Sequence, residues 1–411
     1  MATIARGGQV MTDATRARDQ AVIDAVRALE PAARSQWREL VDLESPSTDA
    51  GALVRALGWI ERALTELGAS MERVPAPRTE DRIGAPDGTS PGAGIAVARC
   101  GADDQRRMLI CTHLDTVHAQ WQGATWAEAG SRVVGPGVAD MKGGVLVALL
   151  ALRALRRAGV EDLSWTMVAT TDEETGSWSS RDALAAVAPG HLAAFIPEPA
   201  MPDGSIVVQR PGSARVSIEA FGRAAHAGRD AAQGISAVTA LCEAVAAAAR
   251  LADPPRRIVN MALLRGGEAT NIIPDRAGAV GNIRWQTEDD GRALMAGLQA
   301  LGRGGPNDLP NVVIDIEVNR PVKERTDAVE ALVRCMQDAA GVLGLQVGAG
   351  FTGGVSDGNI VQAAGVPTLD GMGVRGGNLH RHDEFAELDS LGERAALLAL
   401  TMLRVRDSIR A

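Results

Sequence analysis

Short apolar segments alternate with helical patterns between residues 107 and 196, and this alternation constrains the fold more than any other feature of the chain. Segments 107–112, 163–169 and 192–196 are predicted strands, because each is a short apolar run without helical periodicity. Segment 143–157 is rich in Leu, Val and Ala and is a predicted helix, and 180–187 is a shorter one. Strands that alternate with helices predict an α/β fold with a doubly wound, mostly parallel sheet.

The pattern changes after about residue 203, where predicted strands follow one another directly. Strands are predicted at 205–209, 214–221, 259–264, 278–286 and 311–318, and helices at 236–251 and 287–301. A unit of roughly 110 residues with this content has the size of an independent α+β domain. The α/β pattern returns near residue 326. We therefore expect a catalytic domain of residues 1–204 and 321–411, interrupted by an inserted domain of residues 205–320.

Further helices are predicted near both ends of the chain. Segment 19–43 has an apolar stripe at helical spacing, and we expect Pro31 to divide it. Another helix is predicted at 52–67 and a last one at 388–406. Segment 75–94 is rich in Pro, Gly and charged residues, so we expect an exposed loop there.

Composition excludes several classes of protein. The net charge is −9 and the charges are mixed along the chain, which argues against a nucleic-acid partner. No apolar run approaches the ~18–20 residues that would span a bilayer, and residues 1–13 lack the apolar core of a secretion signal. The four cysteines are scattered, without a CxxC pair. These features predict a cytoplasmic protein with no membrane partner.

Histidines and carboxylates follow the predicted strands, where open α/β sheets place their ligands. They are His113 and Asp115 after the first strand, Glu173 and Glu174 after the second, Glu198 after the third, and His380 after a strand at 366–369, while Asp140 precedes the helix at 143–157. Carboxylates that converge repel one another unless a cation neutralises them. Histidine and carboxylate donors suit zinc, or manganese and cobalt in the same geometry.

Each of these residues alone has an ordinary structural explanation. A His-x-Asp pair is usually a surface hydrogen bond, and adjacent glutamates usually begin a helix, here with Thr171 as the N-cap. Glu198 lies between two prolines and could form a turn, and Asp140 could be an N-cap. The combination favours a metal centre, because one edge of the sheet would collect all of these groups.

Several motifs then occur in order along the chain. They are His113-Leu-Asp115-Thr-Val117, Gly137-Val-Ala-Asp140-Met-Lys-Gly-Gly144, Thr171-Asp-Glu173-Glu174-Thr-Gly176, Pro197-Glu198-Pro199, Gly222-Arg-Ala-Ala-His226-Ala-Gly228, Thr270-Asn271-Ile-Ile-Pro274, Gly353-Gly-Val-Ser-Asp357 and His380-Arg-His-Asp-Glu384-Phe385. From about residue 21 to 406, the chain resembles the M20 metallopeptidases, which include glutamate carboxypeptidase, acetylornithine deacetylase and related aminoacylases. The glutamate carboxypeptidase branch is the most similar, through residues 171–182 and 369–373.

The resemblance implies a centre of two divalent metal ions, zinc first, with manganese or cobalt as alternatives. His113, Asp140 and Glu198 would hold one ion. Asp140, Glu174 and His380 would hold the second, so that Asp140 bridges the two. We expect His118, His191 and His382 to have structural roles. His382 lies two residues after His380, and the spacing of the family motif favours His380 as the ligand.

The resemblance also implies catalytic roles. Glu173 would be the general base, taking a proton from a metal-activated water and delivering it to the leaving nitrogen. Asp115 would orient His113 through its other ring nitrogen. The inserted domain would be a dimerisation or lid domain, and His226 would reach the active site of the partner in a homodimer to stabilise the oxyanion. The ordinary alternative for His226 is a surface histidine that caps a turn.

Substrate contacts follow from the same resemblance. Asn271 and Arg284 would bind a substrate carboxylate, since the guanidinium fork suits a bidentate contact. Arg210 is either a second anion contact or a hinge residue. Gly353 and Gly354 would allow close approach of the backbone to the substrate. Asn282 stands where relatives often carry Asp, which leaves open how Arg284 is held.

These residues predict a metal-dependent hydrolase that cleaves an amide or peptide C–N bond next to a carboxylate-bearing group. Carboxypeptidase and N-acyl-amino-acid amidohydrolase activities both fit, with a small-molecule substrate. The alternative is hydrolysis of a non-peptide C–N bond in a small aromatic carboxylate, as an aryl amide hydrolase or an arylamine deaminase. An inactive binding protein is disfavoured by the intact Glu173 and ligand set. Phosphoester hydrolysis is disfavoured because no phosphate-cradling loop is present.

Overall fold

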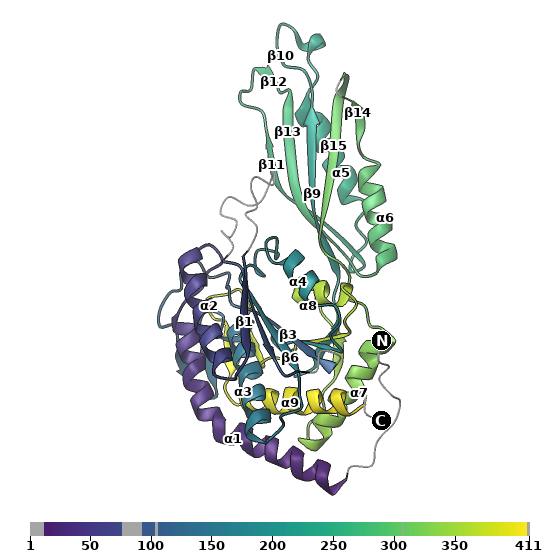
Figure 1. Ribbon diagram of the computed structural model, residues 1–411. Coiled ribbons are helices and arrows are strands. Elements are labelled where there is room, and N and C mark those ends of the chain that lie inside the picture. The colour runs from purple at the N-terminus through teal and green to yellow at the C-terminus, as the bar shows by residue number, and fades with distance from the viewer. Residues whose placement is uncertain (1–11, 76–92, 103–105, 306, 409–411) are drawn as a thin grey trace. The chain divides into compact units, whose positions relative to one another are not determined.

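The computed structural model describes residues 12–75, 93–102, 106–305 and 307–408 (Figure 1). Most of the loop expected at 75–94 lies outside the described residues. The chain forms two compact units. The first contains Met1–Gln209, Arg325–Thr352 and Ser356–Ala411, and the second contains Arg210–Glu324 and Gly353–Val355.

An eight-stranded sheet forms the centre of the first unit. In spatial order its strands are β1 (Ser70–Val74), β2 (Ile95–Cys100), β6 (Trp165–Thr170), β3 (Met108–His113), β7 (Ala194–Ile196), β17 (Thr368–Asp370), β8 (Ile206–Gln209) and β16 (Ala349–Phe351). The pairs from β6 through β17 are parallel, which confirms the predicted mostly parallel sheet. β1 and β2 form an antiparallel edge that sequence patterns did not indicate.

Helices cover both faces of this sheet. Alternate residues of β3 face two different cores, Ile110 one and Leu109 the other, which is why β3 is buried along its whole length. On one side pack α1 (Asp13–Asp42), α3 (Gly144–Arg157) and α9 (Ser390–Ser408), with α2 (Ala50–Thr65) and α7 (Asp327–Val342) beside them. On the other lie α4 (Arg181–Val187) and α8 (Asp357–Ala363).

Two expectations about element boundaries are wrong. Pro31 does not divide the first helix, because α1 continues through it. Its apolar stripe is buried on both sides of the proline, from Val22 to Trp37, and this packing offsets the hydrogen bond that proline removes. The strand at 205–209 was expected to begin the inserted domain, but β8 pairs with β17 and β16 in the large sheet.

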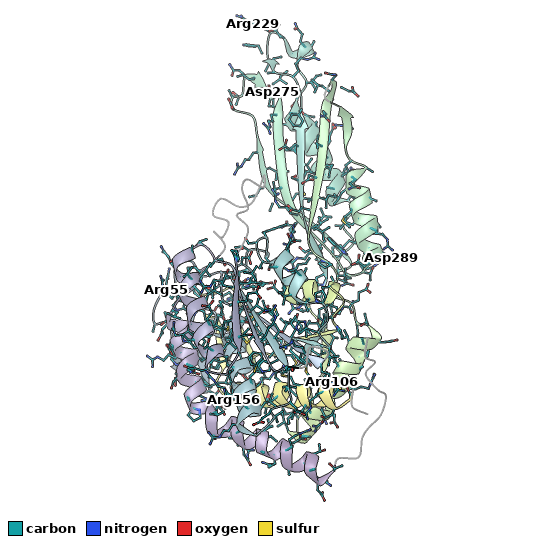
Figure 2. The ribbon with its side chains drawn as sticks, viewed as in Figure 1. Arg55, Arg106, Arg156, Arg229, Asp275 and Asp289 are labelled. Atoms are coloured by element: carbon teal, nitrogen blue, oxygen red, sulfur yellow. The ribbon has the colours of Figure 1, made fainter. Side chains whose placement is uncertain are left out.

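The second unit has a separate antiparallel sheet. Its order is β11 (Arg257–Gly266), β13 (Arg276–Trp285), β9 (Gly212–Phe221), β15 (Asp308–Arg320) and β14 (Arg303–Gly305). Inward residues of β9 and β13 pack against α5 (Ala237–Ala249) and α6 (Glu288–Gln299) in their own core. A short pair of β10 (Ala225–His226) and β12 (Ile272–Ile273) lies at one end, near Arg229 and Asp275 in Figure 2, opposite the end that carries Asp289.

A small four-stranded sheet in the first unit was also not foreseen. It consists of β18 (Gly376–Gly377), β19 (Phe385–Glu387), β5 (Arg132–Val134) and β4 (Ala127–Ala129). It joins the segment after His380 to the segment before Asp140. Among the described helices, none is both long and apolar enough to cross a membrane.

Candidate metal centre

The ends of neighbouring parallel strands bring the proposed ligands together. His113 is the last residue of β3 and pairs in register with Thr170, the last residue of β6. The segments that follow these strands therefore emerge side by side, and they carry Asp115 on one and Glu173 and Glu174 on the other.

Asp140 reaches this edge from the irregular segment η2 (Val138–Gly143), which precedes α3. The backbone of Asp140 is extended rather than helical, so its side chain does not follow the direction of the helical side chains around it. Gly144 permits a close approach to the strand end that carries Glu198, because a Cβ at this position would overlap with the carbonyl oxygen of Pro197.

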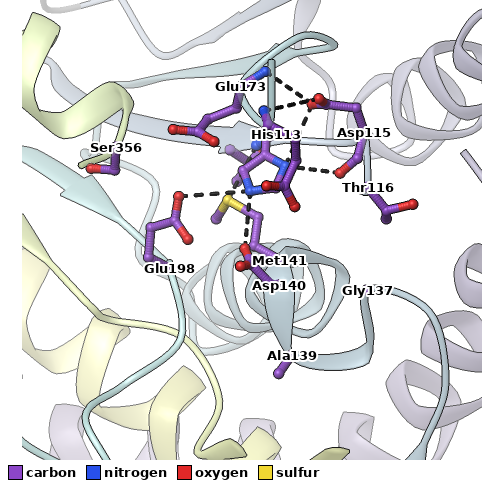
Figure 3. A network of polar contacts seen from close by, with 12 residues as sticks. His113, Asp115, Thr116, Gly137, Ala139, Asp140, Met141, Glu173, Glu198 and Ser356 are labelled. Carbon is purple, nitrogen blue, oxygen red and sulfur yellow. Dashed lines mark hydrogen bonds and ion pairs between the residues drawn. The ribbon is translucent and has the colours of Figure 1, made fainter. Parts of the chain in front are cut away.

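The carboxylate of Asp140 faces a different histidine with each oxygen. Oδ1 lies 3.2 Å from Nε2 of His113, and Oδ2 lies 3.5 Å from Nε2 of His380. Nε2 of His113 is also 3.7 Å from Oε1 of Glu198, and Nε2 of His380 is 3.2 Å from Oε2 of Glu174. Figure 3 shows Asp140 and Glu198 both facing the ring of His113. The structure thus brings together all five residues that the sequence proposed as ligands, with Asp140 between the two groups.

The carboxylates and imidazoles of this cluster shift one another's pKa. Hydrogen bonds with Asp140 and Glu174 raise the pKa of His380 to about 11. Burial and the nearby charge of Asp140 raise the pKa of Glu174 to about 8. Burial opposes the charge of Asp140, but hydrogen bonds with both histidines hold its pKa well below its usual range.

The donor set therefore fits divalent cations. His113, Asp140 and Glu174 each offer a ligand atom within 4.8 Å of the others. The buried carboxylates raise the pKa of His380, and a divalent ion bound by the same groups would take the place of the proton on its imidazole. We infer that this cluster has the charge and the donor chemistry of a metal centre.

Asp115 forms hydrogen bonds with the segments at the ends of β3 and β6. Its Oδ1 accepts a hydrogen bond from the backbone N–H of Glu173 at 3.1 Å, and its Oδ2 accepts one from Glu174 at 3.0 Å. Nδ1 of His113 lies 3.0 Å from the backbone carbonyl oxygen of Asp115 and 3.5 Å from its Oδ1. An Nδ1–H that donates to these oxygens leaves Nε2 of His113 as the ring nitrogen that faces Asp140 and Glu198 and would bind a metal ion.

The two adjacent glutamates point to different places. Glu174 contacts His380. The carboxylate of Glu173 lies beside His113 on the side of Glu198, while the backbone N–H of Glu173 donates a hydrogen bond to Asp115 (Figure 3). The two adjacent carboxylates can thus take different roles, one as a ligand and the other in proton transfer.

Proposed substrate contacts gather at one end of the second unit. Arg284 donates from Nε to Oδ1 of Asn282 at 3.2 Å and from a terminal nitrogen to the carbonyl oxygen of Gly353 at 2.6 Å. Arg210 is buried and donates to the carbonyl oxygen of Gly354 at 3.2 Å. Asn282 therefore still holds Arg284, but as a neutral residue it does not neutralise the charge of the guanidinium.

His226 and Asn271 lie at the other end of that unit. The backbone N–H of Ala227 donates to the carbonyl oxygen of Asn271, so the two proposed contacts are neighbours. Arg284 and Arg276 are eight positions apart on β13, roughly 25 Å in a strand, and His226 lies beyond the Arg276 end. One small substrate therefore cannot contact both Arg284 and His226 of the same chain.

The exposed imidazole of His226 is held in one tautomer. Its Nδ1 accepts hydrogen bonds from the backbone N–H groups of Gly228 at 3.1 Å and Arg229 at 3.2 Å. An accepting Nδ1 places the proton on Nε2, so the exposed nitrogen is a hydrogen-bond donor. The turn that was considered as the ordinary role of this histidine is also what prepares it to donate.

Two residues near the site were missed. Ser47 donates from its hydroxyl to Oδ2 of Asp115 at 2.9 Å, and nothing in its local sequence indicates this. Glu384 accepts hydrogen bonds from the backbone around Asp140. Its place in the same motif as His380 was a signal that sequence reasoning did not use.

Comparisons with known proteins agree with these features. A model of peptidase family M20/M25/M40 matches residues 109–404. Carboxypeptidase G2 from Pseudomonas sp. (strain RS-16) is 26% identical over 400 residues, covering 93% of this chain and 91% of that protein. An aminopeptidase from Bacillus cereus has a similar fold, with a TM-score of 0.71, 21% identity and coverage of 92% of this chain and 98% of the other. A dinuclear metal-binding peptidase from Bacillus subtilis gives a TM-score of 0.68, 18% identity, and coverage of 93% and 99%.

Proposed function

Because the chain belongs to peptidase family M20/M25/M40, we propose that it is a metal-dependent hydrolase of an amide or peptide C–N bond next to a carboxylate-bearing group. Carboxypeptidase and N-acyl-amino-acid amidohydrolase activities are the two forms that fit. The observation that carries the proposal is the carboxylate of Asp140, which presents one oxygen to His113 and the other to His380.

Two divalent ions, zinc first and manganese or cobalt as alternatives, would be held by these residues. His113, Asp140 and Glu198 would bind one, and Asp140, Glu174 and His380 the other. When bound, such ions polarise a scissile carbonyl and make an attacking water more acidic. Glu173 accepts the proton of that water on its carboxylate and passes it to the leaving nitrogen.

Arg284 is proposed to bind the carboxylate of the substrate. Partial burial lowers its pKa from the usual arginine value, yet the group stays charged at neutral pH. Within the described part of the chain its hydrogen-bond partners are the neutral Asn282 and a backbone carbonyl, so the positive charge remains to attract an anion. Carboxypeptidase G2, the relative named above, is a carboxypeptidase by its name, which supports a substrate with a free carboxylate.

Replacing Arg284 tests this contact. We expect Arg284→Lys to raise KM about 10- to 100-fold with a smaller effect on kcat, because lysine cannot make the bidentate contact. Arg276→Lys is the matched control, since Arg276 lies on the same strand and is exposed beside Glu219. Steady-state kinetics of both variants decide the matter, and an unchanged KM in Arg284→Lys would exclude this role.

The separation of Arg284 and His226 supports a homodimer. If both act on one substrate, His226 and Asn271 come from a second copy of the chain. β11 is an edge strand of its sheet and exposes Leu263 and Leu264, which supports an apolar contact there. The assembly would have two-fold symmetry and two equivalent sites.

Metal-reconstituted turnover on a substrate panel tests the whole proposal. The panel contains N-acyl-glutamates, N-acyl-aspartates, dipeptides, aryl amides and amino-substituted benzoates, each measured with and without a chelator. We expect chelator-sensitive release of an amino acid. Turnover confined to the aromatic substrates would replace this proposal with hydrolysis of a non-peptide C–N bond. Turnover that a chelator leaves unchanged would reject the metal mechanism.

A further inference from the structure

Glu384 is a buried carboxylate to which neither the family motifs nor the proposed chemistry assigns a role. It is 1% exposed and lies directly before β19, four residues after His380. Its two oxygens accept hydrogen bonds from another part of the chain, the η2 segment that carries Asp140 and the glycine directly before it. A buried carboxylate with this many hydrogen-bond partners has little freedom to move.

The contacts of Glu384 cap the irregular start of η2. Oε1 accepts hydrogen bonds from the N–H of Ala139 at 2.9 Å and of Asp140 at 3.1 Å, and Oε2 accepts one from the N–H of Gly137 at 3.3 Å. The first N–H groups of a helical segment have no partner within it, so a remote carboxylate satisfies them here. The backbone of Asp140 is therefore held by Glu384.

His118 holds the same carboxylate from a third segment. Its Nε2 lies 3.0 Å from Oε2 of Glu384, and the His118 side chain is 4% exposed. His118 follows His113 by five residues, on the segment that leaves β3. The buried Lys142 adds a positive charge nearby: burial lowers its pKa to about 8, and the charge of Glu384 opposes that shift.

One carboxylate thus joins three segments that each carry a proposed ligand: His113, Asp140 and His380. We propose that Glu384, held by His118, is a positioning residue that fixes Asp140 between the two histidines and so sets the spacing of the two metal positions. The inference rests on the proposed metal centre and adds to it the residue pair that aligns the ligands. His380 depends on this link most, because its side chain is 56% exposed and its loop is anchored through Glu384.

Glu384→Gln removes the charge and one acceptor while keeping the volume. Its remaining oxygen can still accept from Ala139 and Asp140, but its amide group would face the N–H of Gly137 and the imidazole of His118. We expect the weaker of two Zn²⁺-binding steps to lose about 10- to 100-fold in affinity, with the tighter step changed less. Competition titration against a chromogenic chelator measures both steps without any substrate.

Cobalt reports the geometry directly. The visible absorption spectrum of the Co²⁺-loaded protein depends on coordination at each position, so Glu384→Gln should change the spectrum at full Co²⁺ loading. At saturating Zn²⁺ we expect kcat to recover in part and KM to stay close to that of the parent protein. A residue that only stabilised the fold would leave the spectrum of the folded fraction unchanged.

Asp19→Asn is the control for lost stability. Asp19 is buried on α1 and pairs with Arg404 of α9, so its replacement should lower the melting temperature without altering metal affinity or the cobalt spectrum. If Glu384→Gln does not fold, His118→Gln removes the imidazole but leaves the backbone contacts of Glu384, and we expect a smaller loss of about 5- to 10-fold.

The outcomes separate this inference from the proposed function. If the parent protein binds no divalent ion, the metal centre itself is rejected. If the parent binds two ions and the Glu384→Gln or His118→Gln protein binds both with the same affinity and cobalt spectrum, the positioning role is rejected and the metal centre stands. A loss of affinity at only one of the two metal-binding steps supports both the metal centre and the positioning role of Glu384.

Discussion

Glu173→Gln is expected to lower kcat by about 10³-fold while leaving metal content and KM close to those of the parent protein. Glutamine has nearly the same shape, but its amide cannot accept the proton of the attacking water. The backbone N–H of residue 173 still donates to Asp115, so the loop that carries Glu174 stays in place. Metal content and steady-state kinetics measured on the same preparation give both numbers.

Neighbouring substitutions make this result specific. Glu174→Gln should lower metal content, because Glu174 contacts His380 in the cluster. The exposed Glu161 serves as the matched control, and Glu161→Gln should change neither quantity. If Glu173→Gln keeps more than about a tenth of the parent turnover, the proton is accepted elsewhere and the assignment of the base is wrong.

His226→Ala is expected to lower kcat by about 10²- to 10³-fold without loss of metal. The physical reason is the tautomer: backbone N–H groups occupy Nδ1, so Nε2 donates toward negative charge that develops on the substrate oxygen. Alanine removes that donor but no proposed ligand. Metal analysis of the purified variant separates this effect from damage to the metal centre.

Mixing variants tests whether His226 acts across a dimer. A dimer of one Glu173→Gln chain and one His226→Ala chain contains one site with both groups intact. With random exchange, an equal mixture should recover about a quarter of the parent activity, since half of the dimers are mixed and each has one working site. Full activity of His226→Ala alone, or no recovery in a mixture that exchanges chains, would contradict the role in the partner site.

Local patterns in the chain were sufficient for the central strands and for the candidate ligands. β3 and β6 are buried on both faces, so their sequences are mostly apolar and can be recognised without knowing what they pack against. The polar residues after them stand out because they interrupt that pattern. The edge strand β1 is mostly exposed, and β2 beside it directly follows the segment rich in Pro and Gly; neither strand was recognised from the sequence.

Other features depend on partners that are distant in the sequence. Whether α1 continues through Pro31 is decided by its packing against α3 and α9, and β8 belongs to the large sheet because it pairs with β17. Glu384 looked like part of a motif until the structure placed it against the backbone of Asp140. The distance between Arg284 and His226 likewise depends on the pairing of β13 with β9, which places Arg284 at one end of the sheet and the segment of His226 at the other.

By itself, then, the sequence determined the α/β class, the positions of the buried strands and the residues able to bind metal, because burial and strand ends leave their mark on consecutive residues. The tertiary structure alone decided which oxygen of Asp140 faces which histidine, what holds that carboxylate in place, and at which end of the second unit each substrate contact lies. Those relations join segments tens to hundreds of residues apart, and only folding brings their atoms within reach of one another.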